Sequence, residues 1–172
     1  NHIVDTKLSK YEVYNDLFPS RKEGVNAWVS IMRGCDKFCT FCIVPFTRGR
    51  ERSRSIESIV QETQKAVIEG FVEVTLLGQN VNSYRTPEGG FADLLSEVAK
   101  IDGLKRIRYT SPHPQDMTDD VLKVMSENHN ICNYIHLPLQ SGSDRILKRM
   151  NRTYNSNEFL VLCDKIKSYM QN

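Results

Sequence analysis

The order of apolar runs constrains the fold of this 172-residue chain more than any other sequence feature. Short runs of β-type residues are predicted as strands at 28–32, 72–77, 107–110 and 134–139. An amphipathic helical stretch follows each later run, so strands and helices alternate. This order implies parallel strands joined by right-handed helical crossovers. We therefore expect an α/β fold with a parallel sheet and helices outside it, although four strands are too few to close a barrel.

Capping residues mark where the predicted helices begin and end. A small polar residue precedes each apolar helical face, because its side-chain oxygen can accept from a free backbone N–H group. Glycine favours the end of a helix, where it adopts a left-handed conformation at low cost. The predicted N-caps are Ser55, Thr118, Ser143 or Asp144, and Asn155, which resembles a capping box with Glu158; Gly70 and Gly103 are the predicted stops.

Each predicted strand is followed by a polar loop, and these loops cover 33–42, 78–84, 111–116 and 140–144. In parallel α/β folds the loops after the C-terminal strand ends meet at one rim and carry the chemistry, so we expect the functional site there. His113 is predicted to shape the third loop, with a cofactor or substrate role left open. His136 is predicted to be a hydrogen-bonded core residue of the fourth strand, which Pro138 either ends or places at an irregular rim.

The chain has five cysteines, and three of them, Cys35, Cys39 and Cys42, lie within eight positions. This crowding favours a reducing compartment and thiolates that bind a metal. A structural zinc needs a fourth ligand, which a distant histidine or Cys132 would have to supply. A 4Fe-4S cluster held by three thiolates instead keeps one iron open for a chelating ligand. Cys132 and Cys163 are otherwise predicted to be small buried apolar residues.

The net charge of +2 conceals a separation of charge along the chain. Segments 48–54, 105–108 and 145–152 hold 11 of the 23 basic residues and one acidic residue. These arginines either pair with carboxylates on neighbouring elements or form basic zones that suit an anionic partner. The sequence has no apolar run near 18 residues and no apolar signal core, so we expect no membrane segment and a cytoplasmic location.

The amino-acid sequence around the cysteines resembles that of a known family. CDKFCTFC, with Phe41 before the last cysteine, resembles the motif of the radical S-adenosylmethionine (SAM) enzymes. IMRGCDKFCTFCIVPFTRGRERSR, LLGQNVNSY and HLPLQSGSDRILKRMNR are similar to the methylthiotransferase branch, most of all to members that act on isopentenylated adenosine beside the tRNA anticodon. The resemblance implies a partial TIM-type (β/α) barrel, with about four of the six strand-helix units of such a core.

The resemblance also implies an organisation of the chain. Residues 1–24 would be a connector from a missing N-terminal domain, and 25–172 a radical SAM core truncated at its C-terminal side. The chain lacks an initiating Met and stops inside a helical pattern, which fits a piece of a longer protein. We expect this piece alone not to methylthiolate tRNA.

The cofactors that the resemblance implies are a 4Fe-4S cluster and S-adenosylmethionine. Cys35, Cys39 and Cys42 would hold the cluster, and the cofactor's amino and carboxylate groups would chelate the fourth iron. Further cofactor contacts carried over by position are Phe41 for adenine, Gly78 and Gln79 for the methionyl amine, Ser111 at the end of the third strand, Gln140 and Ser141 for the carboxylate or ribose, and Arg149 or Arg152 for the carboxylate or a tRNA phosphate. Relatives often have Gly-Gly-Glu where this chain has Gly78 and Gln79, and the glutamate is absent here.

The partners implied are tRNA and an electron donor such as flavodoxin or ferredoxin, for a parent enzyme that is monomeric. A second 4Fe-4S cluster, held by three cysteines of the N-terminal domain, would deliver the sulfur or methylthio group. Two alternatives stay open: a relative acting on threonylcarbamoyl-adenosine or a ribosomal protein, and a zinc-stabilised RNA-binding module without catalysis. Anaerobic reconstitution with iron and sulfide distinguishes the zinc-stabilised module from an enzyme core, because a cluster gives a brown protein and zinc gives a colourless one.

Overall fold

A parallel sheet of three strands lies at the centre of the protein. The computed structural model describes residues 19, 21 and 23–170. The strands follow the order β1 (Asn26–Ser30), β4 (Glu73–Leu77) and β7 (Arg106–Tyr109). In the middle strand, Thr75 pairs with Trp28 on one side and with Arg108 on the other. The predicted α/β class with a parallel sheet is therefore confirmed.

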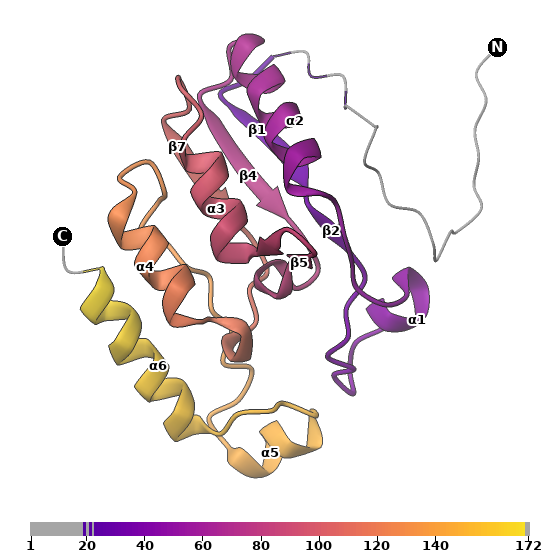
Figure 1. The fold of residues 1–172 in the computed structure, drawn as a ribbon. Helices are drawn as coiled ribbons and strands as arrows, with labels where there is room; N and C mark the ends of the chain where they lie inside the picture. Colours follow the sequence, from indigo (N-terminus) through magenta and orange to yellow (C-terminus); the bar gives the residue numbers. More distant parts are fainter. Residues whose placement is uncertain (1–18, 20, 22, 171–172) are drawn as a thin grey trace.

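Helices α2, α3, α4 and α6 lie side by side in chain order, α2 to α4 cover one face of the sheet, and α5 lies apart at one end of the molecule (Figure 1). Their bounds are α2 (Ile56–Ile68), α3 (Phe91–Ala99), α4 (Asp119–Glu127), α5 (Asp144–Arg149) and α6 (Ser156–Tyr169). Ser55 caps α2 by accepting from the Ser58 amide at 3.3 Å, as predicted. The predicted capping box of Asn155 and Glu158 at the start of α6 is also present. Gly70 follows the end of α2 with a positive φ of 97°.

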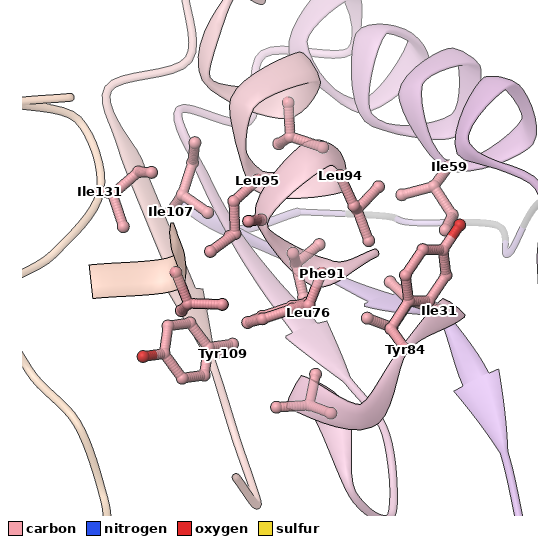
Figure 2. Close-up of a cluster of buried hydrophobic side chains, with 14 of the residues drawn as sticks. Ile31, Ile59, Leu76, Tyr84, Phe91, Leu94, Leu95, Ile107, Tyr109 and Ile131 are labelled. Atoms are coloured by element: carbon pink, nitrogen blue, oxygen red, sulfur yellow. The ribbon is translucent and has the colours of Figure 1, made fainter. Parts of the chain in front are cut away.

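The main core fills the space between the sheet and α2 to α4. Figure 2 shows Leu76 and Ile107 of the sheet near Leu94 and Leu95 of α3, and all four side chains are fully buried. Burial of this kind stabilises a domain by about 1.5–3 kcal/mol per large aliphatic side chain. Strand side chains alternate between faces. The face away from the helices therefore carries polar groups and Trp28, which is 56% exposed.

Two short hairpins extend the C-terminal ends of the strands. The first pairs β2 (Met32–Arg33) with β3 (Arg52–Ser53) and closes the loop that carries the three clustered cysteines. A short helix, α1 (Val44–Arg48), lies inside this loop. The second hairpin pairs β5 (Arg85–Thr86) with β6 (Gly89–Gly90), and single turns of 3-10 helix, η1 (Val81–Ser83) and η2 (Pro114–Asp116), complete the later loops. The sequence analysis predicted neither hairpin.

The predicted fourth strand at 134–139 is wrong, and the described sheet has three strands rather than four. The chain pairs with β7 at a single parallel bridge, Ile107 with Ile131, and then leaves the sheet. Pro138 has no backbone N–H group to donate, which weakens a ladder at this position. The correction extends to His136, which is exposed rather than a core residue.

Most of the predicted connector 1–24 lies outside the described residues. Within it, Arg21 binds Glu62 of α2 and donates to the Trp28 carbonyl oxygen at 3.1 Å.

In the described part of the chain, no helix has both the length and the apolar character that a bilayer crossing requires.

Candidate functional site

A cavity of about 210 Å³ opens where the polar loops meet, beyond the C-terminal ends of the strands. All three clustered cysteines contribute to its wall, together with residues of three later loops. The lining residues are Cys35, Lys37, Cys39, Phe41, Cys42, Gln79, Asn80, Ser111, Pro112, His113, His136, Pro138, Gln140 and Arg152. The rim predicted from the strand-helix order is thus the place where the chemistry-bearing residues gather.

The three cysteines are free thiols that face this one cavity. Cys35 is buried, whereas Cys39 and Cys42 are half-buried. Burial raises the pKa of the Cys35 thiol above its ordinary value, a hydrogen bond from the Lys37 backbone opposes this, and the charge of Glu51 adds to it. Without a bound cation, Cys35 therefore stays protonated more readily than an exposed cysteine does.

Backbone geometry at the start of the cysteine loop depends on glycine. Gly34 has a φ of 81°, and a Cβ at this position would collide with the Arg50 carbonyl oxygen. The loop can therefore close on itself only because residue 34 has no side chain. The Gly34 amide donates to Gln79 Oε1 at 2.7 Å, which ties the cysteine loop to the loop after β4.

A polar network forms the wall opposite the cysteines. Lys37 Nζ binds Asp116 Oδ1 at 2.8 Å, and Asn80 Nδ2 donates to Asp116 Oδ2 at 2.7 Å. Asn80 is 2% exposed, and its Oδ1 atom has no hydrogen-bond partner in the described part of the chain. An unsatisfied buried acceptor is costly. Asn80 thus lines the cavity while its Oδ1 atom stays buried behind the wall.

His113 is buried in the same wall and is uncharged at neutral pH. Its pKa is lowered to about 4, mainly by burial and also by the positive charges of Arg152 and Lys37, against the opposing effect of Asp116. Its Nδ1 atom accepts from the Gln115 amide at 3.2 Å and so begins the turn η2. The predicted loop-shaping role is confirmed, and the ring also faces the cavity.

Four of the predicted cofactor contacts line the cavity: Phe41, Gln79, Ser111 and Gln140. Phe41 is 55% exposed, so one face of its ring is available for stacking. Ser111 and Gln140 have positive φ values of 59° and 73°. Such strained backbone is found at functional turns.

The other three predicted contacts are not among the lining residues. A Cβ on Gly78 would lie 2.7 Å from Met32 Cγ, so this glycine allows close packing of the loop on β2. Ser141 Oγ accepts from the Ser143 amide at 3.1 Å. The Arg149 side chain is exposed, and its backbone carbonyl oxygen accepts from Thr40 Oγ1 at 3.0 Å.

Sequence reasoning missed Lys37 and Asn80 and left Arg152 as an alternative to Arg149. All three line the cavity. Asn80 follows Gln79 directly in a loop after a strand, and this position could have indicated that Asn80 lies at the site. The contacts of Lys37 and Arg152 join residues far apart in the sequence, so no local pattern indicates them.

Cys132 and Cys163 do not belong to the cavity wall. Both are half-buried, and Cys163 packs against the small cluster of Leu147, Tyr154 and Phe159. Among the described residues, no three His, Cys, Asp or Glu side chains converge to hold a single metal ion. A 4Fe-4S cluster spreads its thiolates over separate irons. Three free thiols around one cavity fit that donor set.

In the first two basic segments, four arginines pair with carboxylates, as one of the two interpretations predicts for them. Arg50 Nε lies 2.6 Å from Asp36, and Arg106 and Arg108 both bind Glu73 at 2.6 and 3.2 Å. The third segment differs. On α5, three basic residues are exposed, and no ion pair to them is found among the described residues: Arg145, Lys148 and Arg149.

Comparison with known proteins identifies the family. The profile described as the radical SAM superfamily matches residues 29–172. The chain belongs to the radical SAM superfamily. It is 50% identical over 169 residues to the tRNA-2-methylthio-N(6)-dimethylallyladenosine synthase of Carboxydothermus hydrogenoformans, which covers 96% of this chain and 38% of that protein. It is 55% identical over 163 residues to the same-named protein of Parabacteroides distasonis, which covers 91% of this chain and 36% of that protein.

Solved structures of two radical SAM enzymes share the fold of this chain, although their sequence identity to it is low. OxsB, a cobalamin-dependent S-adenosylmethionine radical enzyme, aligns with a TM-score of 0.63 and 17% identity over 81% of this chain and 22% of that chain. TsrM from Kitasatospora setae, a radical S-adenosylmethionine methyltransferase with cobalamin and a 4Fe-4S cluster bound, aligns with a TM-score of 0.62 and 15% identity over 80% of this chain and 28% of that chain. The likeness supports the partial TIM-type (β/α) fold, with three strands here rather than four.

Proposed function

We propose that this chain is the catalytic core of a radical SAM methylthiotransferase that installs a methylthio group at C2 of isopentenylated adenosine beside the tRNA anticodon. The observation that carries the proposal is the convergence of three free thiols on one cavity at the C-terminal rim of the parallel sheet. The relatives' names support isopentenylated adenosine as the substrate. The chain spans 35–39% of the length of the relatives it matches, so the activity of the whole protein is part of the proposal.

In this proposal Cys35, Cys39 and Cys42 hold a 4Fe-4S cluster, and its open iron takes the amino and carboxylate groups of S-adenosylmethionine. When bound, the cluster would supply one electron for reductive cleavage of the cofactor's sulfonium, and the cofactor would supply the radical chemistry directed at the adenine C2. The residues of this chain position and shield the reactants, because the radical chemistry belongs to the cofactor.

The residues that line the cavity support cofactor contacts within this proposal. Phe41, which is 55% exposed, stacks on the adenine. Gln79 meets the methionyl amine, and its Oε1 atom also accepts from the Gly34 amide. Ser111 and Gln140 meet the ribose or the carboxylate from the opposite loops.

The proposal extends to the whole protein. Residues 1–24 connect to an N-terminal domain whose second 4Fe-4S cluster delivers the sulfur or methylthio group, and 25–172 form the radical SAM core. Flavodoxin or ferredoxin supplies the electron, and the enzyme acts as a cytoplasmic monomer on tRNA. The names of the relatives support isopentenylated adenosine as the substrate over threonylcarbamoyl-adenosine or a ribosomal protein.

Two readouts test the proposal. Anaerobic reconstitution of the chain with iron and sulfide should give a brown protein with about four irons per chain. Cys42→Ala should lose most of this iron, whereas Cys163→Ala, outside the cavity, should keep it. In cells that lack the gene, tRNA should lose its methylthio-isopentenyladenosine, and the full-length gene should restore it unless it carries Cys42→Ala.

Two results would contradict the proposal. A colourless chain that binds one zinc points to the RNA-binding module without catalysis. A tRNA nucleoside profile that is unchanged by loss of the gene, or that lacks only a threonylcarbamoyl derivative, rules out the proposed substrate.

A further inference from the structure

The segment 149–154, which begins at the last residue of α5, holds the cysteine loop from a distant part of the sequence. The Thr40 amide donates to the Met150 carbonyl oxygen at 3.2 Å. Asn151 Nδ2 donates to the Phe38 carbonyl oxygen at 3.0 Å, and Asn151 itself has a positive φ of 56°. These contacts fix the backbone of the loop between its first and last cysteine.

The same segment places a guanidinium beside a cluster thiol. Arg152 Nη1 lies 3.3 Å from Cys39 Sγ, within hydrogen-bonding distance of the sulfur. Its Nε donates to the Tyr154 hydroxyl oxygen at 3.0 Å, and its Cζ lies 5.1 Å from the centre of the Tyr154 ring. The Tyr154 hydroxyl in turn donates to the Leu139 carbonyl oxygen at 3.0 Å, and Tyr154 is 9% exposed. A buried side chain thus sets the direction of Arg152.

We propose that Arg152 raises the reduction potential of the cluster by donating a hydrogen bond and positive charge to the Cys39 sulfur. This inference rests on the proposed function, because it concerns the cluster that the three cysteines would hold. Net charge and hydrogen bonds to the cysteine sulfurs are among the factors that set such potentials. Reduction adds one electron from an external reductant and no proton, so a fixed positive donor stabilises the reduced state more than the oxidised one.

This assignment differs from both roles considered for the arginines in the sequence. In this role Arg152 contacts neither a cofactor carboxylate nor a tRNA phosphate, because its guanidinium group already lies beside the Cys39 sulfur. Arg149 is the matched comparison: it lies in the same segment and carries the same charge, but its side chain is exposed and does not line the cavity.

The test is a redox titration of the anaerobically reconstituted chain with dithionite, followed by electron paramagnetic resonance. Arg152→Gln should lower the equilibrium constant for cluster reduction about tenfold, which is about 59 mV for a one-electron couple. Arg152→Lys, which keeps the charge, should recover part of this shift. Arg149→Gln should titrate like the wild type.

The outcomes separate this inference from the proposed function. If the wild type forms no cluster, the proposed function fails. If Arg152→Gln holds a full cluster with the wild-type potential, the inference is wrong although the function stands. If Arg152→Gln does not fold, Tyr154→Phe, which removes the hydroxyl that accepts from Arg152, should shift the potential in the same direction by less, and an unchanged potential would overturn the inference.

Discussion

At the scale of single residues, the neutral state of His113 makes a prediction about pH. Burial lowers the pKa of His113 to about 4 from an ordinary value of 6.5. Between these two values the unfolded chain binds a proton that the folded chain does not, so stability rises with pH and falls as pH decreases from about 6.5 towards 4. His113→Gln should remove this component, because the backbone of residue 113 remains bound to Asn82 at 2.8 and 3.0 Å.

Urea unfolding of the metal-free chain at pH 7.5, 6.5 and 5.5 measures the effect. The stability difference between wild type and His113→Gln should change with pH by up to about 1.4 kcal/mol per unit below pH 6.5. His129→Gln, on an exposed histidine, should run parallel to the wild type. Equal slopes for wild type and His113→Gln would show that folding does not change the pKa of His113 and would contradict the prediction.

Single residues also show how much of the site the sequence can predict. Cys35, Cys39 and Cys42 were predicted because their spacing is local and their chemistry specific. Asn80 and Arg152 were not assigned their roles, because each acts through a partner more than 30 residues away, Asp116 and Cys39 respectively. Local patterns carry no information on such contacts.

At the scale of elements, the helices that have a capping residue and an apolar face were predicted from the sequence. The segment 134–139 was predicted wrongly, because its pairing depends on neighbouring strands. Ser55 and Asn155 cap their helices as expected. The run 134–139 has strand-type residues, yet the chain meets β7 at a single bridge centred on Ile131, before the run begins. Strand propensity depends on cross-strand neighbours, which the sequence does not display.

Helix α2 carries a second prediction, because a charged residue lies on its buried face. Glu62 is 1% exposed and binds Arg54 Nη1 at 2.6 Å and also Arg21. Arg54 donates to the Ser30 carbonyl oxygen at 2.8 Å, so the network joins α2 to the ends of β1 and β3. Glu62→Gln leaves two buried guanidinium groups without their carboxylate and should lower the free energy of unfolding by about 3–5 kcal/mol.

Chemical denaturation measures this loss, and Glu57→Gln provides the matched control on the same helix. Glu57 is exposed in the first turn, so its replacement should cost about 1 kcal/mol or less. A similarly small cost for Glu62→Gln would mean that the network does not hold α2 against the hairpin.

At the scale of the whole molecule, the distribution of paired and unpaired charge predicts where the tRNA of the proposed function would bind. Four arginines of the first two basic segments bind carboxylates, and two of them, Arg106 and Arg108, share Glu73. Helix α5 is different, because Arg145, Lys148 and Arg149 are exposed and the segment that follows α5 lines the cavity through Arg152. Phosphate contacts release counterions, so each contact makes affinity fall more steeply with salt.

Replacing all three of these α5 residues by Gln should therefore weaken tRNA binding and reduce the slope of log affinity against log salt by about 2–3. A matched triple replacement, Lys123, Lys165 and Lys167 by Gln, removes the same charge from α4 and α6, where each lysine pairs with a carboxylate. Fluorescence titrations with tRNA at several salt concentrations distinguish the two. If both triple variants lose affinity and slope equally, net charge rather than α5 governs binding; if only the α5 variant does, the basic helix beside the cavity is the phosphate-contacting surface.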